Sequence, residues 1–304
     1  MAYPVGAAPW FVDNQLTKNI LLLSFDGLDA PVALIDCAHL VEPFSRLCNG
    51  WAFSEISASD IPPFMTVSKI DTGYRIDCTP LSKPRDTYEP EEYKDECAII
   101  CAMIADLSTA FGRFNETVFS LHCAGLMIGQ RLVVFPAMGR SGKSTMSVHL
   151  TAAGARYFSD DVLPFFGDDG HIISLGFAPR LRLPLSDRVD QLFKDFVSRR
   201  GDLANKRYQY ILPEDDKWAP HGERASISAV VLLDRDPECT QAVLAEAKKS
   251  EALKRLVGQN FDSNLDISKR FQRLHDLAGD VTCHHLRYAE TGEAVPLLFE
   301  AFGA

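Results

Sequence analysis

The chain has 304 residues, 46% of them hydrophobic and 24% charged, which is ordinary for a globular protein with one large or two medium-sized domains. Its 31 Lys and Arg residues against 41 Asp and Glu give a formal net charge of −10, which argues against a general nucleic-acid binder, because phosphate contacts need clustered cations. We find no leader with a small-residue cleavage site, and the apolar stretch at 98–107 is far below the ~20 residues of a membrane span, so we expect a cytoplasmic protein.

Residues 1–88 predict a small α+β domain that is rich in strands. NILLLSFDG and PVALIDC, within 19–37, indicate two strands around a turn. FMTVSKIDTGYRIDC, at 64–78, is typical of a hairpin that turns at Thr72-Gly73. The charged, proline-containing segment 83–96 follows as a junction. We therefore expect domains over 1–88 and 89–304, and the first is a candidate for substrate recognition.

The second domain is expected to begin with a buried helix at about 91–111, where apolar residues recur at helical spacing. TVFSLHCAGLMI and RLVVFPA predict two strands joined by a tight turn at Gly129-Gln130. ARYFSDDVLPFF and HIISLGF, which flank 167–170, predict another hairpin. After a polar, Arg-rich region the predicted elements are a strand at 227–234, helices within 240–277, a strand over VTCHHLRY and a terminal helix. The pattern predicts an α/β fold with a mixed sheet and hairpins.

The stretch FPAMGRSGKSTMSVHL, at 135–150, matches the phosphate-binding motif G-x-x-x-x-G-K-[ST] except that Ala137 replaces its first glycine. A strand before the loop and a helix after it would direct backbone N–H groups and the positive end of the helix dipole at a phosphate. Lys143 would reach the β- and γ-phosphates, and the Ser144 hydroxyl would bind Mg²⁺. The residues expected to hold the nucleotide are Ala137, Met138, Gly139, Arg140, Ser141, Gly142, Lys143, Ser144 and Thr145.

Alanine at position 137 is the smallest departure from glycine. A strained non-glycine residue costs roughly 1–3 kcal/mol, so we expect weakened binding rather than none. The loop alone does not name the reaction, but a GTPase should also contain N-K-x-D. Asn205-Lys206 is followed by Arg207-Tyr208 instead, which argues against a GTPase.

A pair of carboxylates, Asp160 and Asp161, follows the strand after the loop's helix. Adjacent acids at this place can take two roles, one towards Mg²⁺ and one as a base. Two neighbouring acids also raise the pKa of at least one of them, which suits proton uptake from a hydroxyl nucleophile.

The segment LHCAGLMIGQRLVVFPAMGRSGKSTMSVHLTAAGARYFSDDVL resembles the catalytic core of the HPr kinase/phosphorylase family. His122 lies 21 residues before Lys143 (143 − 122) and Asp161 lies 18 after it (161 − 143), and both spacings are similar to those of the family. The resemblance covers about 118–166. Further on, GFAPRLRLP, NKRYQYIL and ISAVVLLDR resemble segments of divergent HPr-kinase-related proteins. The resemblance implies an HPr-kinase-type P-loop kinase core.

The resemblance also implies roles for single residues. Asp161 would be the general base, His122 would orient it, and Lys143 would hold the transferred phosphoryl group. Ser144 and Asp160 would serve Mg²⁺. For stabilisation of transition-state charge, Arg182 and Lys206 are the first candidates among several cations.

Three departures from the family leave the acceptor open. Ala137 replaces glycine, GFAPRLRLPLS carries no carboxylate for a downstream Mg²⁺ ligand, and the family's Arg-containing signature loop is not recognisable. The predicted function is transfer of the γ-phosphate of ATP, with Mg²⁺, to a serine-type hydroxyl of a peptide or protein. A nucleotide-binding regulatory module with little transfer activity and a kinase of a small-molecule hydroxyl are the alternatives. The family resemblance implies a homo-oligomer.

Overall fold

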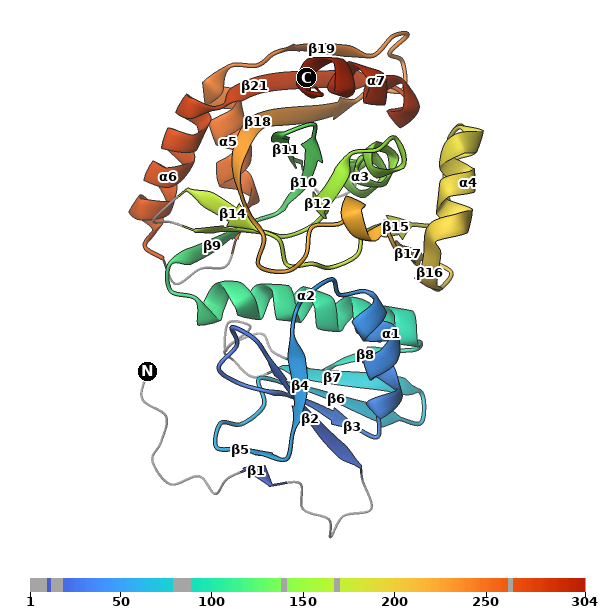
Figure 1. Ribbon diagram of the computed structural model, residues 1–304, viewed down its shortest axis with the longest axis vertical. Helices are drawn as coiled ribbons and strands as arrows, with labels where there is room; N and C mark the ends of the chain where they lie inside the picture. The colour runs from blue at the N-terminus through green and yellow to red at the C-terminus, as the bar shows by residue number, and fades with distance from the viewer. Residues whose placement is uncertain are drawn as a thin grey trace. The chain divides into compact units, whose positions relative to one another are not determined.

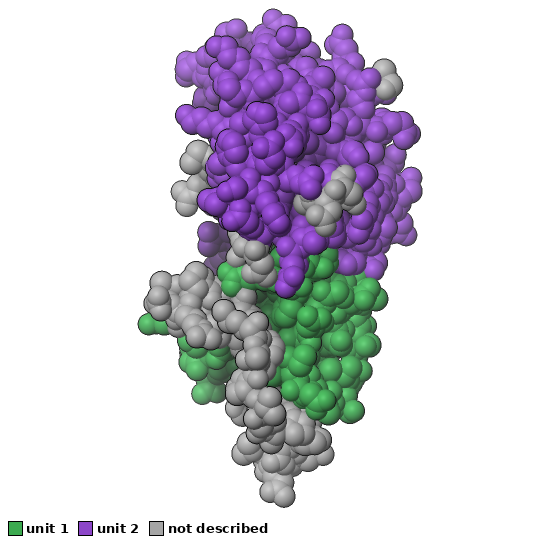
Figure 2. All heavy atoms as spheres, turned by 90° about the vertical axis from the view of Figure 1, so that its left-hand side faces the viewer, with its two compact units in different colours: residues 1–46, 51–115 green, residues 47–50, 116–304 purple. Residues whose placement is uncertain are grey.

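The computed structural model describes residues 10–11, 19–78, 89–137, 141–166, 170–261 and 265–303. The chain divides into two compact units, which Figure 2 colours separately. Unit 1 comprises residues 1–46 and 51–115, and unit 2 comprises residues 47–50 and 116–304. The described part of the chain is mixed α/β, with several sheets and seven α-helices (Figure 1).

Unit 1 contains a six-stranded sheet in the order β4-β2-β3-β6-β7-β8. Its strands are β2 (Ile20–Phe25), β3 (Val32–Ile35), β4 (Phe53–Ile56), β6 (Met65–Ile70), β7 (Gly73–Cys78) and β8 (Glu91–Tyr93). The antiparallel pairs β2–β3 and β6–β7 confirm both predicted strand pairs. The second turn lies at Asp71-Thr72, one residue before the predicted position, because Gly73 already pairs with Ile70. Part of the expected junction is instead the strand β8, which pairs with β7. The smaller elements are β1 (Trp10–Phe11), which pairs with β5 (Ala58–Ser59), η1 (Ala38–Leu40) and α1 (Val41–Arg46).

The helix α2 (Glu96–Phe114) closes unit 1. It begins where the Asp95 side chain accepts a hydrogen bond from the backbone N–H of Ala98 at 2.8 Å, an N-cap that satisfies one of the first free donors. Its buried face packs on the sheet, and the Cys78 thiol donates to Asp106 at 3.2 Å. Because of this packing, unit 1 extends to residue 115, whereas the sequence predicted a boundary between 88 and 89.

By length and composition, α2 is also the one helix in the described ranges that could cross a membrane. The apolar stretch predicted at 98–107 was too short, because the helix continues beyond Leu107 to Phe114. Half of the apolar window is buried. Core helices of globular domains have the same composition, and we interpret α2 as one of them.

Unit 2 is built on a ten-stranded mixed sheet with a path β12-β10-β11-β18-β14-β13-β9-β20, and β21 pairs with both β18 and β19. The strands are β9 (Val118–Leu121), β10 (Cys123–Ile128), β11 (Arg131–Pro136), β12 (Arg156–Ser159), β13 (Leu163–Phe166), β14 (His171–Ile173), β18 (Arg224–Arg235), β19 (Val243–Glu246), β20 (Asn260–Phe261) and β21 (Thr282–Tyr288). The β10–β11 and β13–β14 pairs confirm the predicted hairpins, although residues 167–169 lie outside the described ranges.

Three neighbouring strands of this sheet, β11, β18 and β21, are parallel. Alternate residues of β18 point to opposite faces: Val231 packs towards α3 and α7, and Val230 packs towards α5 and α6. Figure 1 shows these helix pairs on the two sides of the strands. The four helices are α3 (Lys143–Ala152), α5 (Lys249–Gln259), α6 (Ile267–Asp280) and α7 (Thr291–Phe302). The carboxyl ends of the three parallel strands therefore meet at one edge, next to the start of α3.

Sequence patterns missed several elements of unit 2. The polar region at 180–224 holds a three-stranded sheet and two helices. They are β15 (Arg180–Arg182), α4 (Gln191–Arg200), β16 (Gly201–Ala204), β17 (Tyr208–Ile211) and η2 (Asp215–Lys217). Within 240–277, where only helices were expected, Val243–Glu246 form β19 because they pair with β21 at the edge of the sheet.

Candidate active site

The loop of the predicted phosphate-binding motif connects β11 to α3, and Met138, Gly139 and Arg140 lie outside the described residues. Ala137 is buried, and it is not among the described non-glycine residues with positive φ. The strain that we expected from its side chain is therefore absent. Gly142, in contrast, has φ +90°, and a Cβ atom there would lie 3.4 Å from the Tyr288 hydroxyl. Position 142 needs glycine for its backbone conformation.

Lys143 is the first residue of α3, and only 6% of its surface is exposed. Its Nζ atom donates to the backbone carbonyl of Ala137 at 2.6 Å and lies 3.1 Å from Nε2 of His122. Burial lowers the pKa of Lys143, and this outweighs the opposing effect of Asp161 and other nearby acids. The protein therefore holds a desolvated cation at a helix N-terminus, and a bound anion would stabilise that charge.

His122 follows β9, and its backbone N–H donates to the carbonyl of Gln259 at 2.8 Å. Its Nε2 atom lies 2.8 Å from Oδ1 of Asp161, besides its contact with Lys143. One ring nitrogen cannot donate to a carboxylate and accept from an ammonium group at the same time. The two contacts therefore correspond to alternative positions of the proton on the imidazole ring.

The two adjacent carboxylates have different environments. Asp160 is 9% exposed, and it accepts hydrogen bonds from the Tyr157 hydroxyl at 3.0 Å and from the backbone N–H of Arg180 at 3.3 Å. Burial, followed by repulsion from Asp161, raises the pKa of Asp160 to about 6, although a hydrogen bond with Ser144 acts in the opposite direction. The Asp161 side chain is 52% exposed. One carboxylate is thus held inside the protein, and the other faces solvent beside His122.

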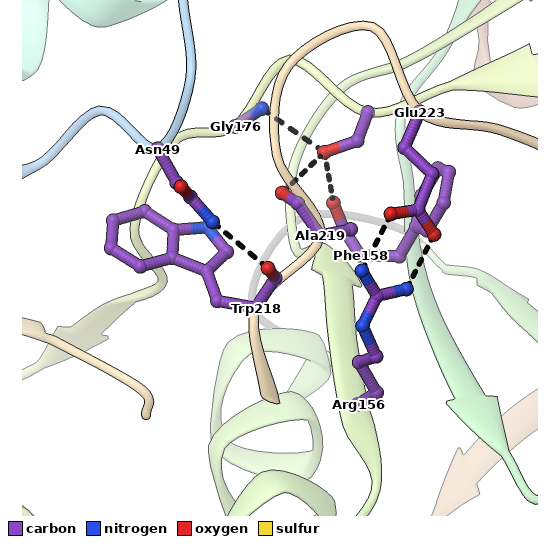
Figure 3. A network of polar contacts seen from close by, with 8 residues as sticks. Asn49, Arg156, Phe158, Gly176, Trp218, Ala219 and Glu223 are labelled. Carbon is purple, nitrogen blue, oxygen red and sulfur yellow. Dashed lines mark hydrogen bonds and ion pairs between the residues drawn. The ribbon is translucent and has the colours of Figure 1, made fainter. Parts of the chain in front are cut away.

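A polar network holds β12, the strand that leads to this pair (Figure 3). The Ser174 hydroxyl contacts the carbonyls of Phe158 and Ala219 at 3.2 and 3.1 Å and accepts from the Gly176 N–H at 3.0 Å. A second contact, between the guanidinium of Arg156 and both carboxylate oxygens of Glu223, fixes the start of the strand. In the same view, Asn49 donates to the Trp218 carbonyl at 2.9 Å. Because the carboxylates follow directly after β12, this network positions them.

These groups line one cavity of about 720 Å³ in unit 2. Among the sequence-predicted residues, those lining it are His122, Ser141, Gly142, Lys143, Ser144, Thr145, Asp160, Asp161 and Arg182. Ala137 touches the cavity's Lys143 through its carbonyl. Lys206 is not among the described lining residues, because it lies in the turn between β16 and β17.

Three further residues belong to the site although sequence reasoning did not select them. The Tyr157 hydroxyl donates a hydrogen bond to Asp160, and both Arg235 and Tyr288 line the cavity. Arg235 and Tyr288 stand opposite each other in the pairing of β18 with β21, at the ends of these parallel strands. Both residues stand at the carboxyl ends of predicted apolar strands. That position could have identified them from the sequence, because ligands of α/β sheets bind at this edge.

Comparison with known proteins adds little to this description. No family model matches the chain, and a search of curated proteins finds no match. Among solved structures, the chain is similar to the Hpr(Ser) kinase/phosphatase from Coxiella burnetii, with 12% sequence identity over 60% of this chain and 92% of that one, at a TM-score of 0.24. A TM-score of this size does not establish a shared fold.

Proposed function

We propose that the chain is a kinase that transfers the γ-phosphate of ATP to a serine-type hydroxyl of a peptide or protein. The observation that carries the proposal is the meeting of a buried lysine, a histidine and two unlike carboxylates in one cavity. Phosphoryl transfer needs cations around the phosphates, a base for the acceptor hydroxyl and hard oxygen ligands for a metal ion. Each need has a candidate among these residues.

The nucleotide would bind at residues 137–145. The backbone N–H groups at the start of α3 and the Nζ atom of Lys143 would contact its phosphates. On binding, Lys143 would exchange its contacts with the Ala137 carbonyl and His122 for phosphate oxygens. Burial lowers the pKa of Lys143 in the protein alone, and this pKa would rise when the negatively charged phosphates bind.

Ser144 and Asp160 fit the ligand requirements of Mg²⁺. They supply one hydroxyl and one carboxylate oxygen, and they already lie within hydrogen-bonding reach of each other. Mg²⁺ in kinase sites takes one or two protein ligands and completes its shell with phosphate oxygens and waters. When bound, the ion would neutralise phosphate charge. It would also compensate the burial of Asp160 in its ionised form.

In the transfer step, the carboxylate of Asp161 would take the proton of the acceptor hydroxyl. The acceptor oxygen would form a bond to the γ-phosphorus as the bond from that phosphorus to the bridging oxygen of ADP breaks. His122, 2.8 Å from Asp161, would orient the carboxylate. Arg182, which lines the cavity, would stabilise the charge on the transferred group. Lys206 stays a sequence prediction without this support.

The test uses purified protein, γ-labelled ATP, Mg²⁺ and an extract of the source cells separated into protein, peptide and metabolite fractions. The Asp161→Asn variant runs alongside, with Asp280→Asn at the exposed end of α6 as the matched control. Label that enters one fraction with wild type and Asp280→Asn, but not with Asp161→Asn, supports a kinase and identifies its acceptor class. Nucleotide binding without any labelled acceptor supports the regulatory module instead.

A further inference from the structure

The side chain of Tyr288 places a hydroxyl group next to a cluster of apolar side chains. It ends β21, and its ring is 1% exposed in the apolar cluster under α3 and α7. Its hydroxyl is buried and has no hydrogen-bond partner among the described residues. The same oxygen lies 3.4 Å from where a Cβ atom of Gly142 would stand, and Tyr288 lines the cavity. The hydroxyl therefore points at the phosphate-binding loop.

A buried hydroxyl without a partner destabilises a protein, and native structures contain few of them. Phenylalanine would fill the same apolar space without that cost. Ser141, on the loop itself, also has a buried hydroxyl that lacks a partner in the described part of the chain. Ser141 and Tyr288 thus each contribute a hydroxyl group near the N-terminus of α3, where the backbone also supplies donors. A phosphate oxygen at this place would accept hydrogen bonds from these groups.

We propose that the Tyr288 hydroxyl donates a hydrogen bond to a phosphate oxygen of the bound nucleoside di- or triphosphate. This inference rests on the proposed function, since it needs phosphate at the 141–143 turn. Burial raises the pKa of Tyr288 to about 12, so the group keeps its proton at neutral pH and acts as a donor. The pairing with Arg235, at the end of the next strand, places a second donor group at the same edge, although this guanidinium also lies 3.5 Å from the carboxylate of Glu290.

The role explains why a strand at this edge of the sheet ends in tyrosine. The parallel register of β11, β18 and β21 delivers the loop, Arg235 and Tyr288 to one edge. Bound phosphate would accept a hydrogen bond from the buried hydroxyl group, and this bond would form only in the complex. Replacing Tyr288 with phenylalanine should therefore weaken phosphate binding without destabilising the ligand-free protein.

The experiment compares wild type, Tyr288→Phe and Lys143→Ala by titration calorimetry with ADP and with inorganic pyrophosphate, and by urea unfolding without ligand. We expect Tyr288→Phe to bind both ligands about 10-fold or more weakly, which is the loss of one hydrogen bond to a charged group. Its urea midpoint should equal or exceed that of wild type. Tyr157→Phe is the matched control for stability, because its hydroxyl donates to Asp160 at 3.0 Å and its loss should lower the midpoint.

Three results would overturn the proposal, and they are distinguishable. If Tyr288→Phe binds ADP and pyrophosphate like wild type while Lys143→Ala does not, Tyr288 has no part in binding and the proposed function stands. If Tyr288→Phe lowers the urea midpoint as Tyr157→Phe does, the hydroxyl has a partner within the protein. If wild type itself binds neither ligand, the proposed function fails together with the inference.

Discussion

Oδ1 of Asp161 lies 2.8 Å from Nε2 of His122, and the same nitrogen lies 3.1 Å from Nζ of Lys143. The imidazole thus stands between an exposed carboxylate and a buried ammonium group. A proton on Nε2 favours the contact with Asp161 and excludes the hydrogen bond from Lys143. In the proposed complex, phosphate would draw Lys143 away and leave His122 to orient Asp161. Nucleotide binding would then also prepare Asp161 for its proposed role as the base.

Replacing Asp161 with asparagine should separate transfer from binding. The amide keeps the size of the side chain but cannot take a proton from the acceptor, so we expect transfer to fall by on the order of 10²–10⁴-fold. Nucleotide affinity should stay within about 3-fold of wild type, because Asp161 is not among the proposed phosphate or metal ligands. Phosphoryl transfer and ADP titration measure the two quantities. Unchanged transfer in Asp161→Asn, with Asp280→Asn as the control, would remove Asp161 from the role of base.

Lys143→Ala should weaken nucleotide binding and transfer together. The lost charge contacts two phosphates in the proposed complex, so we expect the dissociation constant to rise about 10- to 100-fold. The empty protein should lose little stability, because burial already disfavours the charged form of this lysine, as its lowered pKa indicates. Titration with ADP and urea unfolding check both parts, with the exposed Lys254→Ala on α5 as control. Wild-type affinity in Lys143→Ala would contradict the assignment of the loop.

Local sequence patterns predicted much of the fold but not all of its elements. The β6–β7 and β10–β11 hairpins were predictable because apolar periodicity and glycine turns are encoded within a few residues. The strand β19 was not, since four mostly exposed residues become a strand only by pairing with β21. The helix α4, with exposed Leu192, lies in the polar, Arg-rich segment in which no element was predicted.

The candidate site likewise contains residues that local sequence patterns predicted and residues that they did not. Residues 141–145 and the Asp160-Asp161 pair are contiguous motifs, and sequence reasoning selected them. The selection of Arg235 and Tyr288 required the parallel register of two strands, β18 and β21, that are separated by 46 residues (236–281). No local pattern contains that register, because it is a property of the assembled sheet.

The stability of the empty protein should depend on pH through Asp160. Its pKa is about 6 in the folded protein against an ordinary value of 3.8, chiefly because of burial. Between these pH values the folded state keeps a proton that the unfolded state has lost, so the free energy of unfolding falls as pH rises from 4 to 6. A shift of about 2 units corresponds to on the order of 3 kcal/mol. That part of the fall should be absent in Asp160→Asn.

Urea unfolding from pH 4 to 7 measures this dependence. The informative quantity is the difference between wild type and Asp160→Asn at each pH, since titrating groups remote from Asp160 contribute equally to both proteins. The difference should change steadily up to about pH 6 and then level off. Parallel profiles for the two proteins would show that the carboxyl group of Asp160 is not perturbed.

Two glycines with similar backbone conformations should respond very differently to alanine. Gly176 (φ +72°) and Gly222 (φ +87°) both lie in the left-handed region, where a side chain costs roughly 1–2 kcal/mol. A Cβ atom at 222 has nothing within 4 Å, but at 176 it would lie 2.2 Å from the carbonyl oxygen of Asn49. Gly176→Ala should therefore be less stable than Gly222→Ala by about 1–3 kcal/mol in urea unfolding, because backbone must move. The Gly176 N–H also donates a hydrogen bond to the Ser174 hydroxyl, which contacts the Phe158 carbonyl in β12. A shift of the backbone at residue 176 should therefore disturb β12 and reduce phosphoryl transfer in Gly176→Ala but not in Gly222→Ala. Equal destabilisation of both variants would mean that the backbone at Asn49 can shift at little cost in free energy. The contacts of this segment would then not position β12, the strand before Asp160-Asp161.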